Sequence, residues 1–95
     1  MEEKIRMISA AARVIEFRKR NPLAIDEEIF QDVSDYISQR KDIKDEKIKV
    51  GMVAAAAKAF KISKENPKLN EKQILRKVME EIPALFLEIS QEEIK

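Results

Sequence analysis

The sequence predicts an all-α domain. Two duplicated helical hairpins are expected to pack as a four-helix domain with pseudo-twofold symmetry, followed by a C-terminal fifth helix. The chain of 95 residues has one glycine and no stretch in which apolar and polar residues alternate, so nothing in it favours strands. When it is shifted by 45 residues, the chain also aligns with itself without a gap. Because this length suits one domain and is short for two, we expect a single domain over 1–95.

The self-alignment pairs residues 4–37 with residues 49–82 and gives 11 identities in 34 positions. The identical pairs are Lys4/Lys49, Met7/Met52, Ala10/Ala55, Ala11/Ala56, Ala12/Ala57, Lys19/Lys64, Asn21/Asn66, Pro22/Pro67, Ile29/Ile74, Val33/Val78 and Ile37/Ile82. Biased composition does not produce this many matches in one ungapped register. We interpret the two segments as repeat units from an internal duplication, separated by a linker over 38–48 and followed by an extension over 83–95.

The first helix of each unit is expected at about 3–20 and 45–65. Its apolar residues are spaced three, four and three apart, which places them on one face of the helix. These residues are Ile5, Ile8, Ala12 and Ile15 in the first unit, and Val50, Val53, Ala57 and Phe60 in the second.

An Asn-Pro pair follows each of these long helices. Proline disfavours helical geometry in the residue before it and lacks the N–H that a continuing helix needs. We therefore interpret Asn-Pro as a helix terminator and not as a functional motif used twice.

The second helix of each unit is expected at about 26–40 and 70–82. Asp26 is the predicted N-cap of the first of these helices, and Asn70 with Gln73 resembles a capping box for the second. Their apolar residues are Ile29, Val33, Tyr36 and Ile37 in the first unit, and Ile74, Val78 and Ile82 in the second.

Alanine runs occupy matched places in the two long helices, at 9–12 (SAAA) and 54–57 (AAAA). Small side chains let two helices approach closely where they cross, and alanine keeps full helix propensity. We predict that the long helices contact each other at these alanines. Alternatively, alanine serves only as a good helix former, which would leave some of these residues on solvent.

The composition argues against an enzyme. The chain has no His, Cys or Trp, so it lacks the usual general base, the thiol nucleophile and any thiolate metal site. Its carboxylates lie in the first turns of helices or at helical spacing from bases, which is typical of a solvated face. It has no glycine-rich phosphate loop and no calcium loop. We expect no catalytic residues, no metal or cofactor and no small-molecule substrate.

The expected location is the cytoplasm. The start, MEEKIRM, lacks the apolar core of a signal peptide, and no stretch approaches the roughly 20 apolar residues of a membrane span. Absence of cysteine suits an intracellular protein. Abundant Lys, Glu and Ile without Cys or His are typical of a thermophile.

Four basic residues near the end of the first helix suggest an alternative function, that of a small nucleic-acid-associated regulator. They are Arg13, Arg18, Lys19 and Arg20. The expected helices mostly begin with acidic and end with basic residues, which complements the helix dipole without a ligand. The net charge is only +1, and no recognised motif or interleaved aromatic residues accompany the cluster. We therefore disfavour nucleic-acid binding.

The two units diverge at their ends. The first continues into the polar SQRKDIKDEK, and the second into the apolar PALFLEISQEEIK. Pro83 suits the first turn of a new helix, or a kink. We expect a fifth helix whose Leu85, Phe86 and Ile89 share a face with Ile82 and close the core.

Leu87 and Ile94, seven residues apart, are expected on a face roughly opposite. A segment with two apolar faces offers more apolar surface than one small bundle needs. The sequence thus predicts a non-enzymatic protein-interaction module that associates with a second copy of itself, as a homodimer, through this segment. The simpler alternative is a larger core cap with one exposed leucine.

Overall fold

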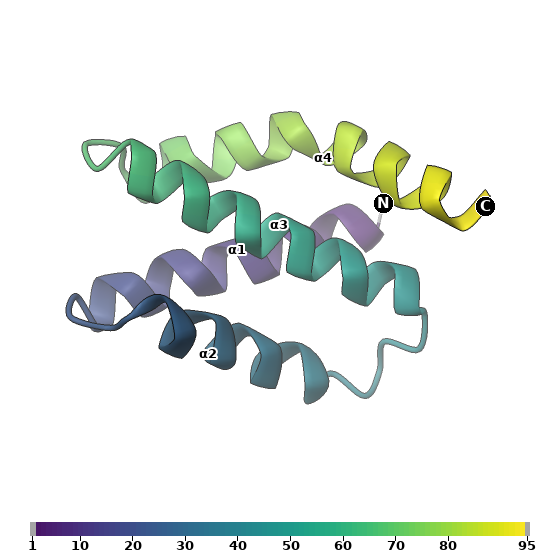
Figure 1. The fold of residues 1–95 in the computed structure, drawn as a ribbon, viewed down its shortest axis with the longest axis horizontal. Coiled ribbons are helices and arrows are strands. Elements are labelled where there is room, and N and C mark those ends of the chain that lie inside the picture. The colour runs from purple at the N-terminus through teal and green to yellow at the C-terminus, as the bar shows by residue number, and fades with distance from the viewer. Residues whose placement is uncertain (1, 95) are drawn as a thin grey trace.

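The computed structural model describes the backbone of residues 2–94, and the side chains of residues 3–85 and 87. It contains four helices: α1 (Glu2–Arg20), α2 (Asp26–Ser38), α3 (Glu46–Glu65) and α4 (Glu71–Ile94), shown in Figure 1. Residues 2–94 contain no strand. The predicted all-α, four-helix domain is confirmed.

Helices α1 and α3 form a central pair that runs in parallel, while α2 and α4 run in the opposite direction on either side (Figure 1). Each outer helix contacts both central helices. Within residues 2–94, α2 and α4 do not contact each other. The architecture is therefore a tightly packed pair flanked by two helices, and both flanks depend on the same pair.

Small side chains line the contact between α1 and α3. Ala10, Ala11, Ala55 and Ala56 have no exposed surface. Gly51 extends the series, because a Cβ atom at this position would lie 3.2 Å from Sδ of Met7. The two long helices thus contact each other at the alanines, as the sequence predicts. The neighbouring Ala57 is exposed, which agrees with the alternative for this part of the second run, that alanine only promotes helix formation.

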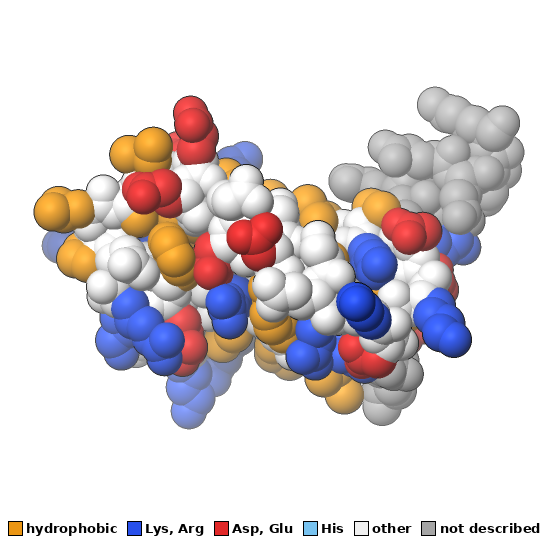
Figure 2. Space-filling view, turned by 90° about the horizontal axis from the view of Figure 1, so that it is seen from below, with side chains coloured by type: hydrophobic (Ala, Val, Ile, Leu, Met, Phe, Trp, Pro, Cys, Tyr) orange, Lys and Arg blue, Asp and Glu red, His pale blue; other side chains and the backbone are white. Residues whose placement is uncertain are grey.

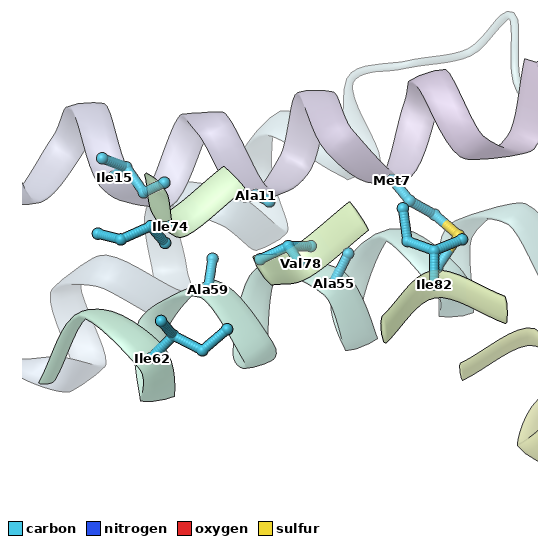
Figure 3. Close-up of a cluster of buried hydrophobic side chains, with 9 residues drawn as sticks. All are labelled: Met7, Ala11, Ile15, Ala55, Ala59, Ile62, Ile74, Val78 and Ile82. Atoms are coloured by element: carbon cyan, nitrogen blue, oxygen red, sulfur yellow. The ribbon is translucent and has the colours of Figure 1, made fainter. Parts of the chain in front are cut away.

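Two clusters of buried apolar side chains flank the central pair. The α4-side cluster lies between α1, α3 and α4 (Figure 3) and consists of Met7, Ala11, Ile15, Ala55, Ala59, Ile62, Ile74, Val78 and Ile82. The α2-side cluster consists of Ala10, Val14, Ile29, Val33, Ile37, Ile43, Met52, Ala56 and Phe60. None of the described polar or charged residues is buried. Hydrophobic burial is therefore the dominant force that holds the four helices together.

The apolar face indicated by the three-four-three spacing coincides only in part with the buried face. Ile5 is 66% exposed, and Val50 and Val53 are about half exposed. The fully buried positions of α1 are instead Met7, Ala10, Ala11 and Val14. The buried face of α1 is therefore rotated about the helix axis relative to the face that the spacing indicates.

Side chains cap the C-terminal ends of α1 and α3 and the N-terminal ends of α3 and α4. The amides of Asn21 and Asn66 donate to the carbonyl oxygens of Phe17 and Ile62, at 3.1 and 3.0 Å, so Asn-Pro does end α1 and α3. The predicted capping box is present: the N–H of Gln73 donates to Oδ1 of Asn70, and the N–H of Asn70 to Oε1 of Gln73. Asp45 caps α3 by accepting from the N–H of Lys47.

The prediction that Asp26 caps α2 is wrong. The N-cap residue is Ile25, and Asp26 is the first residue of the helix. The N–H of Ile25 donates to Oε1 of Glu28 at 2.9 Å. Glu28 thus supplies the reach-back half of a capping box, while an apolar side chain occupies the position that a hydroxyl or carboxylate usually takes.

The prediction of a fifth helix is also wrong, because α4 continues through Pro83 to Ile94. A proline inside a helix removes one hydrogen bond and costs about 3 kcal/mol. Contacts on both sides of Pro83 offset this cost, because Ile82 belongs to the α4-side cluster and Leu85 packs against it. Figure 1 shows the axis of α4 changing direction near its middle, which is the kink that the sequence analysis gave as the alternative.

Enlarging the buried alanines should destabilise the fold. We expect Ala11→Leu and Ala56→Leu each to lower the free energy of unfolding by about 1–3 kcal/mol, because the added carbons force α1 and α3 apart. Ala57→Leu, at an exposed position of the same run, is the control and should change it by less than about 0.5 kcal/mol. Denaturant titration measures all three. Equal effects at the three positions would contradict a tight α1–α3 contact.

Candidate interaction surfaces

The C-terminal half of α4 carries the residues predicted to bind a partner. Leu85 is half-buried and packs against the α4-side cluster, as expected of an anchor. Leu87 is 61% exposed. The side chains of Phe86, Ile89 and Ile94 lie outside the described part of the chain, so the roles assigned to them stay predictions. Figure 1 shows the last turns of α4 running past the ends of α1 and α3.

A second apolar surface, which the sequence analysis did not identify, lies where α1 meets α4. Ile5, Ile8, Ala12 and Met79 line a groove there, with Lys4 and Ser9 at its edge; we call it the α1–α4 groove. Ile5 is largely exposed, and Met79 is 43% exposed. The sequence signal was present in the spacing of Ile5, Ile8 and Ala12, but that face was not expected to lie on the surface.

The α1–α4 groove continues along the outer side of α4. Met79 also lines an adjoining hollow with Lys72, Leu75, Arg76 and Glu80. Within the described residues, Lys4, Lys72 and Arg76 form no ion pair. The groove is therefore an apolar strip whose edge carries three cations, none of which is paired with an acidic side chain among the described residues.

The positions that the 45-residue shift pairs with the α1–α4 groove lie on α3 and α2, and they carry different residues. Val50 and Val53, the counterparts of Ile5 and Ile8, are about half exposed on α3. The counterpart of Met79 is Ser34 on α2, which is polar and exposed. Phe30, the counterpart of Leu75, packs edge-on against the ring of Phe60, with the ring centres 5.0 Å apart. The repeat units thus offer two unlike edges.

Two of the four basic residues considered for nucleic-acid binding make contacts between helices. Arg13 donates to both carboxylate oxygens of Asp32, at 2.9 and 3.1 Å, and lies 5.1 Å from the centre of the Tyr36 ring. The hydrogen bond with Asp32 raises the pKa of Arg13. Arg18 donates to Oγ of Ser63 and lies 5.5 Å from the centre of the Phe60 ring. These contacts tie α1 to α2 and α3.

The other two basic residues, Lys19 and Arg20, are exposed at the end of α1. Arg20 lies 3.8 Å from a carboxylate oxygen of Glu16. On the face that Figure 2 shows, Lys and Arg side chains are interspersed with Asp and Glu side chains. All four basic residues lie in the C-terminal half of α1, but the side chains of Arg13 and Arg18 make contacts with other helices.

The linker between the repeat units is anchored, although its sequence is polar. Ile43 is 5% exposed and belongs to the α2-side cluster. Arg6 donates to Oδ2 of Asp42 at 2.6 Å, which fastens the linker to α1. The guanidinium of Arg40 lies 5.4 Å from the centre of the Tyr36 ring. A single isoleucine in a charged segment is too weak a periodic signal to have predicted this contact.

No group of three or more Asp or Glu side chains in the described part of the chain could hold a metal ion. None of the helices, as far as they are described, is both long and apolar enough to cross a membrane. Comparison with protein-family models, with curated proteins and with solved structures finds no match to this chain. Its function has to be inferred from its own residues.

The ion pair between Arg6 and Asp42 should make stability depend on pH. The hydrogen bond from Arg6 lowers the pKa of Asp42 below its ordinary value, so folding favours the carboxylate. This contribution is present at neutral pH and is lost as the pH falls through the lowered pKa. We expect the difference in free energy of unfolding between wild type and Asp42→Asn to shrink on acidification to about pH 2.

Urea titrations across the pH range measure this difference. The control is Asp35→Asn, because the Asp35 carboxylate accepts a hydrogen bond from the uncharged amide of Gln31. A wild-type advantage over Asp42→Asn that stays constant down to acid pH would contradict the linkage.

Proposed function

We propose that the protein is a non-enzymatic helical interaction module that associates with a second copy of itself through the C-terminal half of α4. The observation that carries this proposal is the exposure of Leu87, at 61%, on a helix that runs past the ends of α1 and α3. Leu85, two residues earlier, packs against the core. An apolar residue therefore remains on the surface after the core contact of this helix has been made.

The sequence around Leu87 supports a contact surface over a single exposed leucine. Residues 84–95 also contain Phe86, Ile89 and Ile94, together with Glu88, Glu92 and Glu93. An apolar centre with a charged rim is the usual composition of a protein–protein interface. Closed homodimers use the same patch on both subunits, so one such segment per chain suffices.

We also infer that the two repeat units pack about an approximate twofold axis along the α1–α3 pair. A shift of 45 residues converts eight of the nine members of the α4-side cluster into members of the α2-side cluster. The ninth, Ile62, corresponds to Phe17, which packs against that cluster. Arg18 and Ser63, themselves 45 residues apart, hydrogen-bond to each other, as counterparts close to such an axis do.

Nucleic-acid binding remains the alternative function, with less support. It rests on Lys19 and Arg20, because Arg13 and Arg18 already have partners in the fold. Protein–nucleic acid contacts weaken steeply as salt is added. Copurified nucleic acid that salt releases would favour this alternative.

The inferred symmetry makes a direct structural prediction. Residues 4–37 and 49–82 should superpose as one helical hairpin with the same angle between its helices. The test is a least-squares superposition of the two segments. Clearly different interhelical angles in the two hairpins would contradict the twofold relation.

The proposed dimer should depend on Leu87 and Ile94. Leu87→Glu with Ile94→Glu would place unpaired charges in the interface, so we expect the dimer to dissociate while helix content is retained. Sedimentation equilibrium and circular dichroism measure the two effects. The control is Leu23→Glu with Ile25→Glu, which adds the same charge at exposed apolar positions in the α1–α2 turn. It should leave the dimer intact. A wild type that stays monomeric at high concentration would contradict self-association.

A further inference from the structure

We propose that α4 pairs antiparallel with α4 of a second copy about Pro83, so that Leu87 of each chain packs against Met79 in the α1–α4 groove of the other. This inference rests on the proposed self-association and specifies its receiving surface. The groove is formed by described side chains on two different helices. It lies on the same helix as Leu87, and an isologous contact would cover both surfaces together.

The spacing along α4 fixes the register. Met79 and Leu87 lie four residues before and after Pro83, so each is about 6 Å from it along the axis. A twofold axis through Pro83 reverses the partner helix and brings Leu87 of one chain opposite Met79 of the other. Successive steps of four residues turn about 40° around a helix, so the three residues share one side of α4.

The middle of the proposed contact allows close approach. Pro83 and Ala84 are both exposed, and neither carries a long side chain. Small residues at the point of closest approach let two helices pack tightly, as the alanines do between α1 and α3. Proline also has no N–H that would need a partner when the contact excludes water.

The exposed apolar surface on either side of Pro83 supplies the attraction. Ile5 and Met79 are both well exposed beside the groove, and Ile8 is half-buried. The side chain of Leu87 would cover Met79 and the neighbouring part of α1. Each such contact occurs twice in the dimer because the axis repeats it.

Charge complementarity identifies the occupant as the chain's own C-terminal segment. In this register residue 93 of one chain falls opposite residue 73 of the other, next to Lys72. Position 93 is a glutamate, and three of the four charged residues in 84–95 are acidic. Lys72 forms no ion pair among the described residues. Lys72 therefore meets the acidic end of the partner helix.

Disulfide trapping tests the register, because the chain has no cysteine of its own. A Met79→Cys chain mixed with a Leu87→Cys chain should form a mixed disulfide under mild oxidation. Each variant alone should cross-link poorly, since its two thiols would lie about 12 Å apart along the helices, beyond disulfide reach. If either variant alone cross-links as readily as the mixture does, the register is wrong.

Charged substitutions test the groove itself. Ile5→Glu with Met79→Glu should weaken dimerisation by about tenfold or more, because burying unpaired carboxylates is costly. Val50→Glu with Val53→Glu is the matched control, since it adds the same charge at comparably exposed positions on α3. It should leave the dimer dissociation constant within about twofold of the wild-type value. Circular dichroism verifies that both variants are folded.

A charge exchange tests the ion pair. Lys72→Glu should weaken the dimer, and adding Glu93→Lys to the same chain should restore it. Failure of the second substitution to restore the dimer would contradict the register.

The outcomes separate this inference from the proposed function. If Leu87→Glu with Ile94→Glu dissociates the dimer while Ile5→Glu with Met79→Glu leaves it unchanged, self-association stands and the groove is not its receiving surface. A monomeric wild type would overturn both proposals.

Discussion

The close approach of α1 and α3 is the constraint on which the rest of the structure depends. Ala10, Ala11, Ala55 and Ala56 are fully buried at this contact, and a Cβ on Gly51 would press against Met7. Alanine buries little apolar area of its own, so the α1–α3 contact contributes little hydrophobic stabilisation directly. It stabilises the fold mainly because it lets the outer helices pack on both central helices. With the central backbones so close, one outer helix can contact both of them on each flank. Larger residues then fill the two clusters.

Each outer helix is held in place by its packing on both central helices. The ion pairs between helices therefore add little to stability and mainly fix the orientation of the outer helices. Arg13 pairs with Asp32 between α1 and α2, and Lys58 pairs with Glu81 at 3.2 Å between α3 and α4. Exposed pairs of this kind are each worth about 0–1 kcal/mol. The 45-residue shift pairs Arg13 with Lys58, and each of these residues ties its long helix to the outer helix that follows it.

The sequence predicts those features of the fold that have local signals. Apolar periodicity, Asn-Pro and the Asn70/Gln73 capping box place the helices, and the alanine runs identify the α1–α3 contact. The rotation of α1 and α3 about their axes has no local signal, so Ile5 was not recognised as exposed. Helix α4 runs through Pro83 because contacts from distant parts of the chain offset a local cost.

The candidate site was predictable only in part, for the same reason. Leu87 was identified from its spacing within one segment. The α1–α4 groove combines Ile5 with Met79, which are 74 residues apart in the sequence, and no local pattern links them. Similarly, Ile43 is buried only because the linker folds back onto the α2-side cluster. A surface or cluster formed by residues of different helices can be predicted only when the packing of those helices is known.

The two edges of the domain differ in the residues that they expose. Inside the core, positions that the 45-residue shift pairs carry similar residues, such as Ile29 and Ile74. At the surface, one edge has Met79 where the other has Ser34. An exposed serine at the matched position means that the packing of an outer helix does not require an apolar residue there. The partly exposed Met79 lies on the α1–α4 surface, so this edge is more apolar at that position than the edge that carries Ser34.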